Sequence, residues 1–109
     1  MIEITIVKDR EREDTILKEL GIEEKEAKIH EMTDKGEKLG LVVSVVKGEL
    51  LKILKIFAGD IEFGYDTDMK PDLEQNFILD SLVRTAASYG ENNGAPRIEC
   101  CFSAFADFF

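Results

Sequence analysis

The chain opens on an alternation of apolar and polar residues. Isoleucine occupies every second position from Ile2 to Ile6. This period of two, built from β-branched residues, predicts a strand over 2–7. Apolar residues then recur with the spacing of one helix face, and they are Ile16, Leu17, Leu20 and Ile22. That spacing predicts a helix over 10–20, with Gly21 as its stop.

Three strand-like segments follow, and turn signals separate them. The segment 27–33 (AKIHEMT) precedes the turn signal Asp34-Lys35-Gly36, and 39–47 (LGLVVSVVK) is rich in valine. The pattern over 50–57 (LLKILKIF) also suits a helix, but its short length and the tight turns before it favour a strand. We therefore expect an antiparallel meander of three strands over 27–57.

A second helix is expected after a long connection over 58–72. Asp72 followed by Gln75 is a helix-start pattern, with Asn76 as an alternative cap. The helix is expected to run to about Tyr89 and to end at one of the next two glycines. Its core face has the spacing i, i+3, i+4, i+7, and it consists of Leu79, Leu82, Val83 and Ala86.

The end of the chain predicts one more strand and the start of another helix. Residues 97–101 (RIECC) read as a short strand, and 103–109 (SAFADFF) as the beginning of a helix. A strand over 50–57, a helix and a strand over 97–101 form a natural right-handed parallel unit. The expected order is β-α-β-β-β-α-β with an incomplete C-terminal helix, in a single α/β (α+β) domain over 1–109.

Composition and charge fit one globular domain and exclude two classes of partner. The 109 residues are 44% hydrophobic and 34% charged. The net charge of −9 argues against nucleic acid and against anionic membrane surfaces. There is no apolar run long enough to span a membrane and no visible signal peptide. The adjacent Cys100 and Cys101 suit neither a disulfide framework nor a zinc site, and we expect a cytoplasmic protein.

The isolated reactive groups do not assemble into a known motif. His30 is the only histidine, and because no nucleophile lies at a motif distance, we expect it on the surface of a strand. Asp66-Thr67-Asp68 fails as a calcium loop, because Lys70 and Pro71 stand where an oxygen ligand and a glycine are needed. Cys100 and Cys101 lack the positive surroundings of a reactive thiolate. We therefore expect no metal and no catalytic cysteine.

The order of elements and the sequence of the second half resemble the GNAT acetyltransferases. LLKILKIF resembles the fourth strand of that family, and ILDSLVRTAASYGENNGAPRIEC resembles its central helix and fifth strand. The individual residues that carry the likeness are Leu82, Arg84, Ala86 and the pair Gly94-Ala95. The resemblance implies a GNAT-like mixed sheet.

The resemblance also implies acetyl-CoA as cofactor and a small or peptide primary amine as acceptor. In the family the pantetheine arm pairs with main-chain groups of the fourth strand, and these would be Ile56, Phe57 and Ala58. A backbone N–H group beside them would stabilise the oxyanion formed when the amine attacks the thioester. Glu99 on the fifth strand is the nearest carboxylate by topology to accept the amine proton.

Two departures from the family favour a different function. The family binds the pyrophosphate in a Gln/Arg-x-x-Gly-x-Gly/Ala loop, whereas 58–74 carries six acids and one base here. The family's closing hairpin and its general-acid tyrosine have no counterpart, and phenylalanines occupy 102, 105, 108 and 109. The alternative is a non-catalytic GNAT-like domain for dimerisation or partner binding. The open strand and the phenylalanines predict a homodimer through the C-terminal edge.

Overall fold

In the part of the chain that the structure describes, six strands form one mixed sheet between two helices. A computed structural model describes residues 2–63 and 72–100 of the chain. The elements in this part are β1 (Ile2–Ile6), α1 (Arg10–Glu19), β2 (Lys28–Asp34), β3 (Glu37–Lys47), β4 (Leu50–Ala58), β5 (Ile61–Phe63), α2 (Leu73–Asn92) and β6 (Arg97–Cys100). Strands β1 to β5 are antiparallel neighbours in chain order, and β6 pairs with β4 in parallel. The expected α/β fold class and the parallel unit β4–α2–β6 are confirmed.

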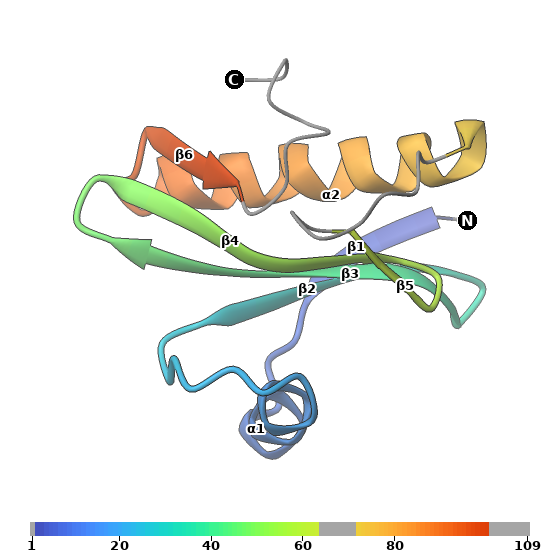
Figure 1. The fold of residues 1–109 in the computed structure, drawn as a ribbon, viewed down its shortest axis with the longest axis horizontal. Coiled ribbons are helices and arrows are strands. Elements are labelled where there is room, and N and C mark those ends of the chain that lie inside the picture. The colour runs from blue at the N-terminus through green and yellow to red at the C-terminus, as the bar shows by residue number, and fades with distance from the viewer. Residues whose placement is uncertain (1, 64–71, 101–109) are drawn as a thin grey trace.

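The two helices cover opposite faces of the sheet, and each covers a separate hydrophobic core (Figure 1). Alternation along the strands divides the apolar residues between the faces, so that Val42 joins the core under α2 whereas Val43 joins the core under α1. The predicted apolar face of α2 is buried, because Leu79, Leu82 and Ala86 are each 0% exposed. The core under α2 is the larger of the two and sets the position of the helix on the sheet.

Helix α2 begins as the sequence predicts and ends at the second of the two glycines that the sequence offers as its stop. The Asp72 carboxylate accepts a hydrogen bond from the Gln75 backbone N–H (2.8 Å), and the Gln75 side chain accepts one from the Asp72 N–H (2.9 Å). The helix continues past Tyr89 to Asn92, because Gly90 is a packing residue. A Cβ atom built there would lie 3.1 Å from Leu51 Cβ. Gly90 therefore lies inside the helix, and Gly94, at a φ of +81° directly after the C-cap Asn93, is the predicted glycine that follows the end of the helix.

The connection expected over 58–72 contains a strand that the sequence analysis missed. Gly59 and Asp60 form a two-residue turn, with Gly59 at a φ of +63°, and β5 folds back on β4. Phe63 at the end of β5 is 2% exposed and belongs to the core under α2. The observed order therefore has one more strand than predicted, and this strand buries Phe63 and packs Ile61 against the same core.

His30 is buried, which corrects the expectation of a surface residue. It is 5% exposed on β2, and its ring stands edge-on to Tyr89 of α2 with 5.3 Å between ring centroids. The strand pattern placed His30 on β2 correctly, but β2 lies inside the sheet and α2 crosses over it. Burial lowers the pKa of His30 below its usual value.

The helix expected over 103–109 and the side chains of Cys100 and Cys101 lie outside what the structure describes.

Candidate functional site

One edge of β4 is shared by two strands with a break between them. Strand β6 pairs with Leu50–Ile53, and β5 pairs with Ile56–Ala58 on the same edge. Within the described residues, no strand pairs with Leu54 and Lys55 on that edge. The opposite edge faces β3, where the register shifts after Val43 and leaves Leu54 as an extra residue. This break is the candidate functional site.

The sequence indicates the break only weakly, and in the structure an ion pair lies beside it. Ile53 and Leu54 are adjacent apolar residues, and such a doublet interrupts the alternation expected of a regular strand. The Lys55 Nζ lies 3.0 Å from the Glu62 Oε1 of β5. The ion pair therefore connects one side of the break to the short hairpin strand.

The structure places Ile56, Phe57 and Ala58 together, in a stretch of β4 that has partners on both edges. The Gly59 N–H donates to the Leu39 carbonyl (2.7 Å), so Gly59 faces β3. Because peptide groups alternate between the edges of a strand, Phe57 faces β3 and Ile56 and Ala58 face β5. Of the three residues that the family resemblance assigns to the cofactor arm, Ile56 and Ala58 thus direct their main-chain groups to β5, and Phe57 directs its groups to β3.

Glu99 lies apart from those residues. It is exposed on β6 and stands opposite Lys52 of β4, before the break. Ile56 is four residues farther along β4, which corresponds to roughly 13 Å at ~3.3 Å per residue. The structure therefore brings Ile56, Phe57 and Ala58 together and leaves Glu99 on the other side of the break.

The start of α2 forms an acidic pocket beside the end of β4. The pocket has a volume of about 460 Å³. Its ionisable lining residues are Glu37, Lys38, Asp60, Asp72 and Glu74. Four carboxylates and one ammonium group favour a cation over an anion. Two of the N–H groups at the start of the helix, those of Asp72 and Gln75, already donate within the capping box. A diphosphate does not fit this arrangement.

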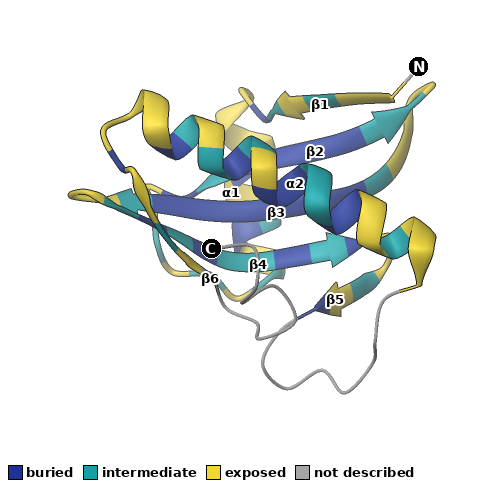
Figure 2. Ribbon diagram, turned by 90° about the horizontal axis from the view of Figure 1, so that it is seen from above, coloured by how far each residue is buried: buried dark blue, intermediate teal, exposed yellow. Residues whose placement is uncertain are grey.

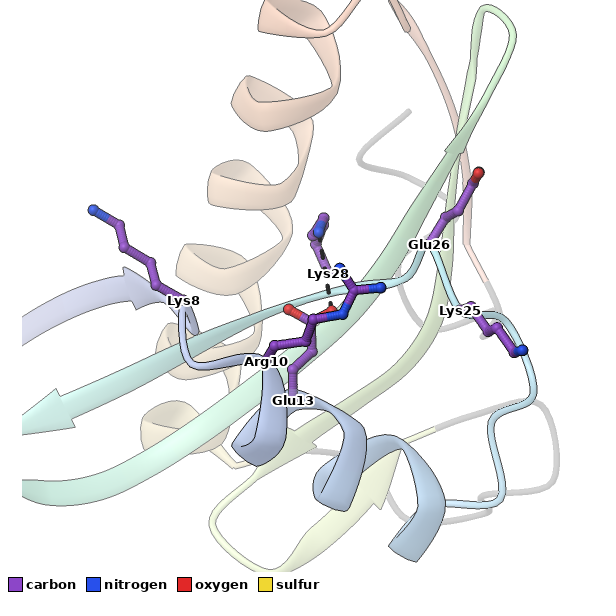
Figure 3. A pocket seen from close by; sticks show the side chains of 6 residues that line it. All are labelled: Lys8, Arg10, Glu13, Lys25, Glu26 and Lys28. Carbon is purple, nitrogen blue, oxygen red and sulfur yellow. Dashed lines mark ion pairs between the residues drawn. The ribbon is translucent and has the colours of Figure 1, made fainter.

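A second pocket lies at the start of α1, and a pair of opposite charges occupies its centre (Figure 3). Its volume is about 350 Å³. Glu13 is 8% exposed, and its Oε1 lies 3.9 Å from the Lys28 Nζ. Figure 3 shows Arg10 extending over Glu13, whereas Lys8 and Lys25 point away from the centre. The central cations thus face a carboxylate of the protein itself.

Two further classes of site were searched for in the described part of the chain. In residues 2–63 and 72–100, no three His, Cys, Asp or Glu side chains gather closely enough to hold a metal ion. No helix in the same ranges is both long and apolar enough to cross a membrane.

Comparisons with known proteins identify the fold. No protein-family model matches the chain, and no curated protein matches it in sequence. The aminoglycoside N-acetyltransferase AAC(6')-Iy in complex with CoA superposes with a TM-score of 0.61 at 13% identity, over 93% of this chain and 79% of that one. The same enzyme with a bisubstrate analogue gives 0.62 at 10% identity, over 99% and 84%.

A third solved structure has a different acceptor in its name and the same arrangement of elements. The ribosomal-protein-alanine N-acetyltransferase from Brucella melitensis biovar Abortus 2308 gives a TM-score of 0.60 at 13% identity, over 92% of this chain and 79% of that one. At these identities the likeness concerns the fold. The chain therefore has the GNAT-type fold of N-acetyltransferases, as the resemblance in its second half predicts.

Proposed function

We propose that this chain is a GNAT-type N-acetyltransferase domain that takes acetyl-CoA and acetylates a small or peptide primary amine. The observation that carries the proposal is the break in pairing at Leu54 and Lys55, between β6 and β5. The likeness to acetyltransferases, including one in complex with CoA, supports the same assignment. The acidic pocket at the start of α2 suits a cationic amine.

The arm of the cofactor fits the edge of β4 if β5 leaves it. The outward N–H and C=O groups of Ile56 and Ala58 would then hold the amides of the arm. One set of hydrogen bonds, each worth about 0.5–1.5 kcal/mol net, replaces another. The main cost is the withdrawal of Phe63 from the core, about 1.5–3 kcal/mol. Acetyl-CoA, when bound, supplies an acetyl group activated as a thioester. The backbone at the break would orient the acetyl carbonyl, and we propose that Glu99 accepts the amine proton, through water.

The diphosphate end of the cofactor is the part that the described residues do not accommodate. The carboxylates of Asp72 and Glu74 stand at the start of α2, where an anion would bind in a phosphate-binding helix. This observation favours a second candidate function, a non-catalytic domain that keeps the fold for partner binding. It also predicts that the diphosphate and adenosine add nothing to the affinity.

Calorimetry with two ligands separates these functions. We expect acetyl-CoA and S-acetylpantetheine, which lacks the diphosphate, to bind with affinities within about threefold of each other. Ile61→Pro should tighten both, because it removes an N–H group of β5 that faces Ala58. Ile61→Val, which keeps the N–H group at the same position, is the matched control and should change neither. If the folded protein binds neither ligand, even as Ile61→Pro, the enzyme assignment is wrong and the partner-binding function remains.

A further inference from the structure

Strand β1 leaves one edge of the sheet open in the described part of the chain. It pairs with β2 on one side, and no described strand pairs with its other side (Figure 2). The Val7 N–H donates to the Ile29 carbonyl (2.8 Å), so Val7 faces β2. By alternation Glu3 and Thr5 also face β2. The N–H and C=O groups of the three isoleucines in β1 therefore point outward.

The same three isoleucines form an apolar row beside α2. Ile4 packs against the core under α2, and Ile2 is 46% exposed. Exposed edge strands are usually protected by lysine, proline or a bulge. The sequence of β1, IEITI, contains no lysine or proline, and its pairing with β2 has no register shift. Within residues 2–63 and 72–100, the outer edge of β1 thus has unpaired main-chain groups, an apolar side, and no lysine, proline or bulge.

We propose that β1 pairs with β1 of a second copy of this chain, antiparallel and around a twofold axis at Ile4. Ile2 then stands opposite Ile6 of the second copy, and Glu3 stands opposite Thr5. All the outward peptide groups meet outward peptide groups, as an antiparallel ladder requires. The two sheets become one continuous sheet, with the isoleucine rows of both copies side by side between the two α2 helices.

Charge and pairing select this register and this partner. A ladder centred on Glu3 would place the two Glu3 carboxylates opposite each other, which is unfavourable. A ladder centred on Thr5 would leave Ile2 without an isoleucine partner. Centred on Ile4, the strand is complementary to itself, which is the property that a twofold dimer needs. The contact is small and each copy carries a net charge of −9, so the dimer forms at high concentration and strengthens with salt.

Disulfide trapping tests the register directly, in a background of Cys100→Ser and Cys101→Ser. In a hydrogen-bonded antiparallel pair the Cα atoms lie about 5.5 Å apart, within the range of a disulfide. Under a mild oxidant Ile4→Cys should therefore form a covalent dimer at least about tenfold faster than Glu3→Cys. Glu3→Cys is the matched control, because Glu3 meets Thr5 and not itself. Equal or faster linking of Glu3→Cys would overturn the proposed register.

Sedimentation of the unmodified chain tests the interface independently of the cysteines. The mass should rise from 12.3 kDa towards twice that value between about 10 µM and about 1 mM. Ile4→Pro should stay monomeric and folded, because the N–H group that it removes faces outward from the sheet. Ile2→Lys, at an exposed position, should weaken the dimer without any backbone change. A mass of 12.3 kDa at every concentration, together with no linking of either cysteine variant, would refute the interface.

Discussion

Gly40 on β3 lies under α2 with no room for a side chain, and Gly40→Ala should destabilise the protein. A Cβ atom built at Gly40 would lie 2.4 Å from the Phe57 carbonyl oxygen and 2.8 Å from the Ile78 Cγ2. It would also lie 3.2 Å from the Leu82 Cδ1. The two helix side chains have some freedom to move. The carbonyl belongs to the neighbouring strand, so relief of that contact requires β3 and β4 to shift.

The size of the effect follows from two opposing terms. Overpacking a core with one extra methyl group costs about 1–3 kcal/mol, and a contact with backbone places Gly40→Ala near the upper end. Replacing glycine by alanine also lowers the conformational entropy of the unfolded chain, which stabilises the folded protein by about 0.4–1 kcal/mol. We therefore expect a net loss of about 2 kcal/mol. For a domain of this size, that corresponds to a fall of about 8–16 °C in melting temperature.

Urea denaturation at low protein concentration measures this loss without a contribution from association. With a slope of about 1–3 kcal/mol per M, the midpoint should fall by about 1 M while the slope stays unchanged. Lys38→Ala, at an exposed position on the same strand, is the control and should stay within about 0.5 kcal/mol. If Gly40→Ala is as stable as that control, the close approach of α2 to β3 is not the constraint described above.

Substitutions at three further positions test other parts of the fold. Burial lowers the pKa of His30 below 6.5, so the unfolded chain takes up a proton at a higher pH than the folded chain. The protein should therefore lose stability as the pH falls below about 6.5. Between about pH 7.5 and pH 5, the free energy of unfolding of His30→Phe should fall less than that of the unmodified chain. Equal losses would show that His30 does not cause this pH dependence. Ser44→Ala should be neutral or stabilising by up to about 1 kcal/mol in a thermal melt, because the buried Ser44 hydroxyl has no hydrogen-bond partner among the described residues. A clear loss would indicate a partner for this hydroxyl. Asp72→Ala should cost about 1 kcal/mol by removing the capping box, whereas Asp72→Ser should retain most of the stability.

The parts of the fold that the sequence predicts are those with local signals. The capping box of Asp72 and Gln75 and the apolar face of α2 are both readable within a few residues. Strand β5 has only three residues, and it exists because Phe63 reaches a core that the rest of the chain builds. The burial of His30 depends likewise on which strand becomes central and where the helix crosses. Neither the formation of β5 nor the burial of His30 can therefore be predicted from the sequence around Phe63 or His30.

The candidate site likewise combines features that the local sequence predicts with features that depend on the whole fold. The family resemblance assigns Ile56, Phe57 and Ala58 to the cofactor arm, and they do lie together on β4. Strand β5 pairs with the same segment because the chain folds back at Gly59 and buries Phe63. The sequence pattern of β4 therefore does not predict this pairing. The acidic character of the α2 start is readable directly from the sequence, because it needs no knowledge of packing.

The unequal cores give the two faces of the sheet different local stabilities. Helix α2 contributes five buried apolar residues to its core, whereas α1 contributes only Leu17 to the buried residues of the other. Free energies of local opening scale with the buried contacts that must be broken. Amide hydrogens of α1 should therefore exchange with solvent well before those of α2 and the central strands. The α1 face is the side of this molecule that can rearrange while the rest of the fold stays intact.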